Sequence, residues 1–239
     1  MMRSFLLTCL LIFSWPSFGQ RDSVIRKSHP ARPIIKMVAA PVALISLGLY
    51  MKDVGSVINR FDVNRWRNKN FPNFSFHADN VFQFAPIGLM YGLDALKVKS
   101  RSDVLNQSLL LIKTELITNG IVFLLKDNTN VSRPDGYKQN SFPSGHTAQA
   151  FMTATLLHKE FGQTNVWYSV GAYTVATSVG VLRVLNNRHW ISDVLVGAGI
   201  GILSTNLVYA THRYRWGRKP VVIAPTYNRG LGIYLSAKL

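Results

Sequence analysis

The stretch PSGHTAQAFMTATLL, residues 143–157, predicts a helix that begins with a polar turn. Pro143, Ser144 and Gly145 come directly before an apolar run, which is the order expected at a helix start. Backbone N–H groups of a first helical turn have no partner within the helix, so they can bind an anion, and a glycine lets that anion come close. Ser144 is expected to cap the helix, to contact the anion, or to do both.

Apolar segments of helical length recur on both sides of this stretch, separated by clusters of Gly, Asn, Asp, Ser or Pro. They cover residues 34–51, 81–97, 105–126, 146–161, 166–182 and 190–211. Few stretches before residue 220 alternate as strands do, so the expected fold is all-α, a membrane-embedded bundle of about six helices. From Pro220 onward, two short apolar runs flank Asn228-Arg229-Gly230 and predict a small β-hairpin.

The ends of the chain differ from this helical middle. Residues 1–19 carry an early arginine, an apolar run and small residues before Gln20, which is typical of a signal peptide or of an uncleaved anchor. One helical domain is expected at 33–212, followed by a tail at 220–239. The single cysteine, Cys9, lies in the leader, so a mature chain would have no disulfide and no cysteine metal ligand.

The composition is strongly basic. Lys and Arg number 27 against 11 acidic residues, which gives a formal net charge of +16. This charge suits anionic lipid head groups, phosphorylated substrates or nucleic acid. Because an exported chain seldom meets nucleic acid, the expected partners are a membrane and a phosphorylated substrate.

The segments at 190–211 and 166–182 are the best candidates for crossing a bilayer. The segment at 105–126 is less suitable, because Lys113 and Glu115 each cost about 2.5–3.5 kcal/mol near the middle of a span. A soluble bundle would accept both. In the last apolar segment, the spacing of Gly197 and Gly201 allows close helix packing.

Cations flank a break in the chain between two helical segments. Lys126 ends one apolar segment. After six intervening residues, Arg133 precedes Pro134, which favours an extended backbone for the arginine. The planar guanidinium can donate two parallel hydrogen bonds to phosphate oxygens. Arg183, at the end of a later helix, adds a third cation. Taken alone, each of these could be an ordinary surface cation.

Two histidines and a carboxylate complete the set. His146 would lie beside an anion bound at the helix start and could donate a proton to a departing oxygen. His189 and Asp193 are four residues apart, so they share one face of a helix that begins near His189. Asp193 would orient the imidazole and leave its other nitrogen free to attack phosphorus.

In order and spacing, these residues resemble the type 2 phosphatidic acid phosphatase superfamily. The matching pieces are Lys126-x6-Arg133-Pro134, Pro143-Ser144-Gly145-His146 and Arg183-x5-His189-x3-Asp193. The resemblance implies that the domain at 33–212 is the helical bundle of that family. It implies phosphate binding by Lys126, Arg133, Ser144, Gly145 and Arg183, with no metal and no cofactor. His189 would be the nucleophile that forms a phosphohistidine, Asp193 its partner, and His146 the acid.

One residue departs from the family pattern. Many members carry serine before the third-motif arginine, whereas this chain has Leu182, so one hydrogen bond could be missing. Arg188 either compensates for this with its charge or is a basic residue at the rim. His158 is expected about 18 Å along the helix from His146, at the opposite end. The basic and aromatic connection from Asn59 to Asn80 either lies over the site or packs onto the bundle.

The membrane side depends on how many segments span. If all do, the site faces the cytoplasm and the basic cluster at 213–219 lies outside, contrary to the positive-inside tendency. If 81–97 or 34–51 does not span, the site faces the periplasm. The leading expectation is therefore a phosphatase of the bacterial-type inner membrane with a periplasmic active site.

The substrate classes considered are phosphatidic acid, phosphatidylglycerophosphate, undecaprenyl diphosphate and lipid A phosphates. The alternatives are a soluble periplasmic acid phosphatase, a vanadate-dependent haloperoxidase and a non-catalytic envelope protein that binds anionic lipid. The haloperoxidase family is similar at the same motif positions, where it binds vanadate. The non-catalytic alternative leaves the two histidines and Asp193 without a role.

Overall fold

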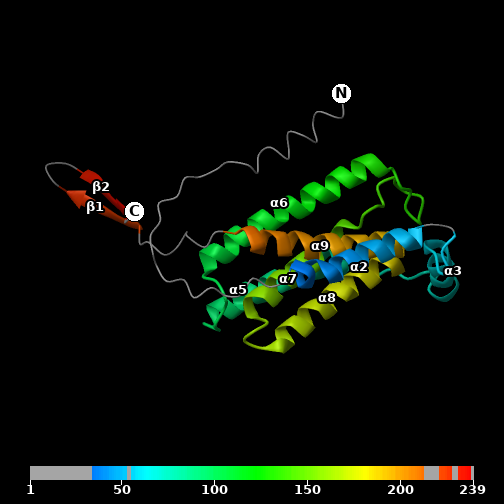
Figure 1. Cartoon of the computed structure of the whole chain (residues 1–239), viewed down its shortest axis with the longest axis horizontal. Coiled ribbons are helices and arrows are strands. Elements are labelled where there is room, and N and C mark those ends of the chain that lie inside the picture. The colour runs from blue at the N-terminus through cyan, green and yellow to red at the C-terminus, as the bar shows by residue number, and fades with distance from the viewer. Residues whose placement is uncertain (1–33, 53–54, 213–220, 228–230, 238–239) are drawn as a thin grey trace, which may run out of the picture. The chain divides into compact units, whose positions relative to one another are not determined.

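The computed structural model describes residues 34–52, 55–212, 221–227 and 231–237, so the predicted leader lies outside the described residues (Figure 1). The described helices are α2 (Ile34–Lys52), α3 (Arg60–Asn70), α4 (Asp79–Phe82), α5 (Ala85–Ala95), α6 (Val104–Thr129), α7 (Gly145–Phe161), α8 (Val166–Leu185) and α9 (Ile191–Thr211). The strands β1 (Val221–Tyr227) and β2 (Leu231–Ala237) form an antiparallel pair, as the predicted hairpin requires.

All six predicted apolar segments contain helices, which confirms the all-α class. The expected number of about six is too low, because α3 and α4 are additional short helices. The apolar pattern could not reveal α3, which is mostly polar. Its start has a capping box, in which Asn59 accepts from Asp62 N–H at 3.1 Å and Asp62 accepts from Asn59 N–H at 3.0 Å.

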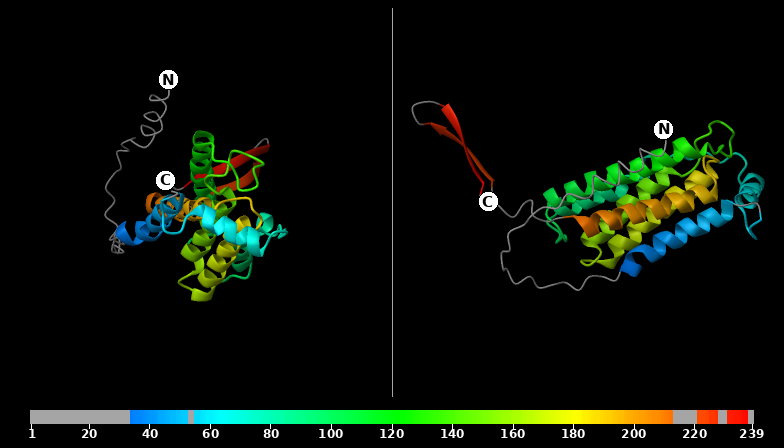
Figure 2. Two further views of the ribbon diagram at one scale, coloured as in Figure 1. Left: turned by 90° about the vertical axis from the view of Figure 1, so that its right-hand side faces the viewer. Right: turned by 45° about the horizontal axis from the view of Figure 1, so that its top comes forward.

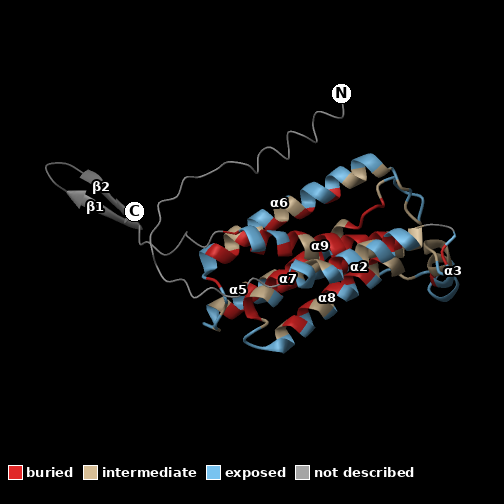
Figure 3. Ribbon diagram, in the orientation of Figure 1, coloured by how far each residue is buried: buried red, intermediate tan, exposed pale blue. Residues whose placement is uncertain are grey.

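The core lies around α7 and α9. The central helix α7 packs against α8 and α9, and α9 packs in turn against α2. Figure 2 shows these helices running side by side along the bundle. Figure 3 shows α7 and α9 largely buried, whereas α2 and α6 have long exposed faces. Buried alanines along α7 and α8 allow these two helices to approach each other; they include Ala150, Ala154, Ala172 and Ala176.

Glycines of α9 allow two other helices to approach closely. A Cβ atom on Gly197 would be 2.5 Å from the Ser144 carbonyl oxygen, and one on Gly201 would be 2.3 Å from the Ala148 carbonyl oxygen. The close packing predicted from their spacing is therefore present, against α7. Gly199 lies on another side of α9, where an added Cβ would be 2.8 Å from the Pro41 carbonyl oxygen of α2.

Four helix ends meet at one end of the bundle. The first turns of α7 and α9 are joined there, because Ser144 N–H donates to the Asp193 carbonyl oxygen at 3.0 Å. The end of α8 leads directly into α9, and Lys126, near the end of α6, lies close to Gly145. The sequence therefore brings two helix starts and two helix ends together.

By length and composition, α2, α6 and α9 could each cross a membrane, so the chain has the helices of a membrane protein. The doubt about 105–126 is not supported, since α6 qualifies despite Lys113 and Glu115. These side chains have polar partners, with Lys113 Nζ 3.2 Å from His212 Nδ1 and Glu115 accepting from Gln149. The helix expected at 166–182 is present as α8, but it is not among these three candidates.

Candidate active site

The structure brings all the predicted site residues to the end of the bundle where the four helix ends meet. Lys126 and Arg183 come from the ends of α6 and α8, and Ser144, Gly145 and His146 from the start of α7. His189 directly precedes the start of α9, Asp193 lies in its first turn, and Arg133 lies between α6 and α7. Lys126, Arg133 and Arg183 lie close enough for their positive charges to repel one another.

His189 and Asp193 lie together, as their spacing predicts, but a serine stands beside both. His189 Nδ1 is 3.7 Å from Asp193 Oδ2, which is an ion-pair distance and too long for a hydrogen bond. Ser141 Oγ donates to Asp193 Oδ2 at 2.5 Å and lies 3.5 Å from His189 Nδ1. The direct hydrogen bond that the imidazole is expected to donate to Asp193 is therefore absent, and Ser141 donates to the carboxylate oxygen that faces the ring.

The Asp193 carboxylate is fixed by its own helix as well. Trp190 N–H donates to Oδ2 at 3.1 Å, and Ser192 Oγ donates to Oδ1 at 3.2 Å. The residue is fully buried, with 0% of its surface exposed. Because three donors hold it, Asp193 provides a rigid negative charge next to His189.

The imidazole of His189 is neutral in this environment. Burial lowers its pKa to about 4, and the nearby Arg183 and Lys126 act in the same direction, while Asp193 acts against them. A neutral imidazole keeps one ring nitrogen unprotonated at neutral pH. The residue therefore has the protonation state that a nucleophile needs.

Asn140 holds two of the cations in place. Lys126 Nζ donates to the Asn140 carbonyl oxygen at 2.6 Å, and Arg133 Nε donates to the Asn140 side-chain oxygen at 3.1 Å. Burial lowers the pKa of Arg133, and the charge of Arg183 lowers it further. Cations that repel one another in this way favour an anion between them.

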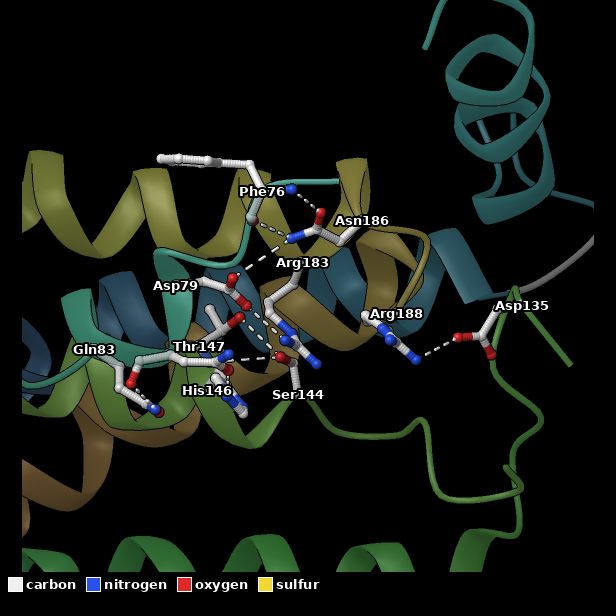
Figure 4. A network of polar contacts seen from close by, with 11 residues as sticks. Phe76, Asp79, Gln83, Asp135, Ser144, His146, Thr147, Arg183, Asn186 and Arg188 are labelled. Atoms are coloured by element: carbon white, nitrogen blue, oxygen red, sulfur yellow. Dashed lines mark hydrogen bonds and ion pairs between the residues drawn. The ribbon is translucent and has the colours of Figure 1, made fainter. Parts of the chain in front are cut away.

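Arg183 is bound on one side only. Its Nη1 donates to Asp79 Oδ2 at 2.5 Å, whereas its Nε is buried without a hydrogen-bond partner (Figure 4). A buried donor with no acceptor is costly unless a ligand supplies one. The guanidinium therefore has a donor available for an anion.

The start of α7 has the predicted cap. Ser144 precedes the first helical residue, its Oγ accepts from Thr147 N–H at 3.4 Å, and it lies 2.9 Å from Thr147 Oγ1. A Cβ atom on Gly145 would meet only ordinary contacts, at 3.6 Å from Val122 and 4.0 Å from Lys126. Packing within the protein therefore does not require glycine at this position.

His146 lies next to the same cations and contacts the short helix α4. Its Nε2 is 2.9 Å from Asn80 Oδ1. Burial lowers the pKa of His146 to about 4, with Arg183 acting in the same direction and Asp79 against it. In the absence of an anion, this histidine is therefore neutral at neutral pH.

The connection from Asn59 to Asn80 lies against the turn that follows α8. Arg67 donates from Nε to the Leu185 carbonyl oxygen at 2.8 Å, and Asn64 Nδ2 donates to Asn187 Oδ1 at 2.8 Å. Several aromatic side chains of the connection stay exposed; they include Trp66, Phe71 and Phe76.

The remaining predicted residues lie outside this cluster. Arg188 forms an ion pair with Asp135 at 3.2 Å, and its side chain is 38% exposed, so it is a rim residue. His158 lies in the last turn of α7, as predicted, with Nδ1 2.8 Å from Ser169 Oγ.

Sequence reasoning missed the side chains that hold the site residues: Asp79, Asn80, Asn140, Ser141 and Asn186. Asn140 and Ser141 lie directly before Phe142-Pro143, and Asn186 lies between Arg183 and His189 of the third motif, whereas Asp79 and Asn80 lie outside all three motifs.

The sequence was also compared with known proteins. A lipid A 1-phosphatase from Porphyromonas gingivalis is 44% identical over 138 residues, which are 56% of this chain and 31% of that protein. The chain thus spans about a third of this relative. The solved structure of Aquifex aeolicus LpxE aligns with a TM-score of 0.46 and 25% identity, over 63% of this chain and 94% of that chain.

A second solved structure is a transmembrane PAP2-type phosphatidylglycerolphosphate phosphatase from Bacillus subtilis. It aligns with a TM-score of 0.47 and 21% identity, over 74% of this chain and 99% of that chain. The sequence profile of the PAP2 superfamily matches residues 108–217, which include every predicted site residue. Residues 108–217 are therefore similar to the PAP2 superfamily over the part of the chain that holds the candidate site.

Proposed function

We propose that this protein is a metal-independent phosphatase that hydrolyses a phosphomonoester or diphosphate on a membrane lipid. The observation that carries the proposal is the buried, neutral His189 beside three cations at a helix start. The relative named lipid A 1-phosphatase supports a lipid substrate and makes the 1-phosphate of lipid A the first candidate.

The phosphoryl group would bind between the cations. Lys126, Arg133 and the unpartnered Nε of Arg183 donate to its oxygens, and the first-turn N–H groups of α7 add further donors. Gly145 leaves space for the oxygens, which explains a glycine that packing does not require. These donors stabilise the charge on the equatorial oxygens as the phosphoryl group is transferred.

In the first step, Nε2 of His189 attacks phosphorus, a P–N bond forms and the P–O ester bond breaks. Asp193, with Ser141, stabilises the positive charge that develops on the ring. Nε2 of His146 exchanges its contact with Asn80 for one with the substrate and then donates its proton to the departing oxygen. In the second step, His146 accepts a proton from water, the water oxygen attacks phosphorus, and the P–N bond breaks to release orthophosphate.

His146 can act as the acid only if it is protonated in the complex. Its pKa of about 4 describes the site without an anion, where neighbouring cations disfavour a further positive charge. A bound phosphate dianion offsets those cations and raises the pKa of His146 toward its ordinary value. Binding of the substrate and protonation of the acid are therefore coupled.

We also propose that the site faces the periplasm from the inner membrane of a bacterial-type envelope. The segment at 81–97 supports this, because it is divided between α4 and α5, and α5 has 11 residues and is about 16 Å long. That is too short to cross the hydrocarbon core. The exposed apolar faces of α2 and α6 favour a membrane protein over a soluble periplasmic phosphatase. Recovery of the protein without detergent in the soluble fraction would contradict this.

The experiment that tests the function is a screen for phosphate release by the purified protein in detergent micelles. The panel contains lipid A 1-phosphate, phosphatidic acid, phosphatidylglycerophosphate and undecaprenyl diphosphate. At least one lipid should be hydrolysed without added metal, and His189→Ala should abolish release. His158→Ala is the matched control, since that histidine lies at the other end of α7 and should keep activity. No release from any lipid, or equal release by His189→Ala, would disprove the proposal.

A further inference from the structure

The short helix α4 contacts two proposed site residues that come from different helices. Asp79 binds Arg183 at the end of α8, and Asn80 lies against His146 at the start of α7. Figure 4 shows Asp79 reaching both Arg183 and Asn186 from this segment. The proposed reaction gives Asp79 no role, although it binds one of the three phosphate-binding cations.

The position of Asp79 is fixed from two sides. Its Oδ2 accepts from Arg183 Nη1 at 2.5 Å, and its Oδ1 lies 3.5 Å from Asn186 Nδ2. Asn186 is itself held by Phe76, donating to its carbonyl oxygen at 2.7 Å and accepting from its N–H at 3.0 Å. Asp79 is 0% exposed, so its charge is little screened by solvent.

A buried carboxylate next to a phosphate site weakens the binding of a dianion. It also holds Arg183 by Nη1, which leaves Nε as the donor available to a phosphoryl oxygen. A lipid substrate is kept at the site by its apolar part and the membrane, whereas orthophosphate is held by the cations alone. Lowering the net charge therefore weakens the binding of the product more than that of the substrate.

We propose that Asp79 is a positioning residue that orients Arg183 and reduces the positive charge of the proposed phosphate site, so that orthophosphate is released after each turnover. This proposal rests on the proposed function of the same site. It assigns to α4 a role in product release that the three sequence motifs do not include.

The test measures orthophosphate binding to the full-length purified protein by isothermal titration calorimetry, together with kcat and KM. Asp79→Asn keeps the shape and an acceptor oxygen but removes the charge. Orthophosphate should bind roughly three- to tenfold more tightly, while kcat falls. Asp135→Asn is the matched control, because it removes a carboxylate from Arg188 on the exposed rim and should change phosphate affinity less than about twofold.

A second variant separates charge from shape. Asp79→Glu keeps the charge but moves it by one methylene, so kcat should fall while phosphate affinity stays at the wild-type value. Should Asp79→Asn not fold, Asp79→Ser supplies a smaller neutral side chain for the same measurement. Unchanged or weaker phosphate binding by the neutral variants, or tighter binding by Asp79→Glu, would overturn the proposal.

The binding measurement does not depend on turnover. A wild-type protein without phosphatase activity, in which Asp79→Asn still tightens phosphate binding, would overturn the proposed function and leave the charge effect of Asp79 standing. Active wild-type protein whose phosphate affinity is unaffected by Asp79→Asn would overturn only the role of Asp79.

Discussion

The two ends of α7 both bury charged groups, but in opposite ways. In its last turn, Glu160 is 2% exposed and accepts from Ser102 N–H at 2.8 Å and from the Tyr209 hydroxyl at 2.5 Å. At its first turn, three cations converge, and Arg183 keeps a buried Nε without a partner. At the far end, groups of the protein bind the charge of Glu160, whereas the near end has donors left over for an anion.

This contrast separates a structural network from a binding site. A buried charge that is fully hydrogen-bonded holds helices together and leaves nothing for a ligand to bind. Surplus donors with like charges destabilise the empty site and favour binding of the opposite charge. Single substitutions at the two ends of α7 test whether one end is structural and the other binds the substrate.

The largest expected effect comes from matched changes of the two buried carboxylates. Asp193→Asn should lower phosphate release about 10⁴-fold per folded molecule, because the ring of His189 loses the charge that orients and stabilises it. Glu160→Gln should keep activity within about twofold but lose about 1–3 kcal/mol of unfolding free energy, since one of its donors loses its acceptor. Activity assays and thermal unfolding measure the two effects. Equal activity losses would mean that the ends do not differ in function.

A smaller effect is expected from a substitution in α9 at the point where it packs against the start of α7. Gly197→Val should reduce activity about 100-fold, because its Cβ would be 2.5 Å from the Ser144 carbonyl oxygen and would push the starts of α7 and α9 apart. Gly171→Val on α8 is the control, since a Cβ there meets nothing within 4 Å. Size-exclusion chromatography identifies misfolded protein before activity is compared. Retained activity in Gly197→Val would show that close packing of α9 against the start of α7 is not needed for activity.

Ser141→Ala should lower kcat about tenfold with little change in KM. The variant removes the hydroxyl donor to Asp193 Oδ2 and leaves the cations in place. Steady-state kinetics on the best lipid of the panel gives both constants. A raised KM with unchanged kcat would instead place Ser141 in substrate binding.

The mildest expected effect is the pH dependence of anion binding. Sulfate is a useful probe because it does not titrate between pH 5 and 8. His146 has a pKa of about 4 in the empty site, and a bound dianion raises it, so the complex holds more protons than the free protein between the two values. Sulfate should therefore bind more tightly as the pH falls from 7 to 6, by less than about tenfold. In His146→Gln this dependence should disappear; if it persists there, another group takes up the proton.

The contrast also explains what the sequence could predict. Lys126, Ser144, Arg183 and Asp193 were predictable because each lies at the end of a helix, and helix ends are readable from apolar runs and their breaks. The spacing within each motif placed the side chains on one face. Their convergence followed from resemblance to a family rather than from any local pattern.

The residues that hold the site were not predictable by the same reasoning. Asp79 and Asn80 contact Arg183 and His146 across 104 and 66 positions of sequence, from a short helix with no apolar period. Ser141 reaches Asp193 across 52 positions. Such contacts depend on how the helices pack, which the periodicity of apolar residues along the sequence does not describe.

The glycines of α9 have a consequence for how this chain can vary. Gly197 and Gly201 face α7, and Gly199 faces α2. Within five residues, the helix therefore has positions without a side chain on two of its sides. Any added methyl group collides with a neighbouring backbone, which cannot rotate away as a side chain can. In a saturation library, this segment should therefore accept fewer substitutions than the exposed face of α6, although none of its glycines contributes a side chain to the chemistry.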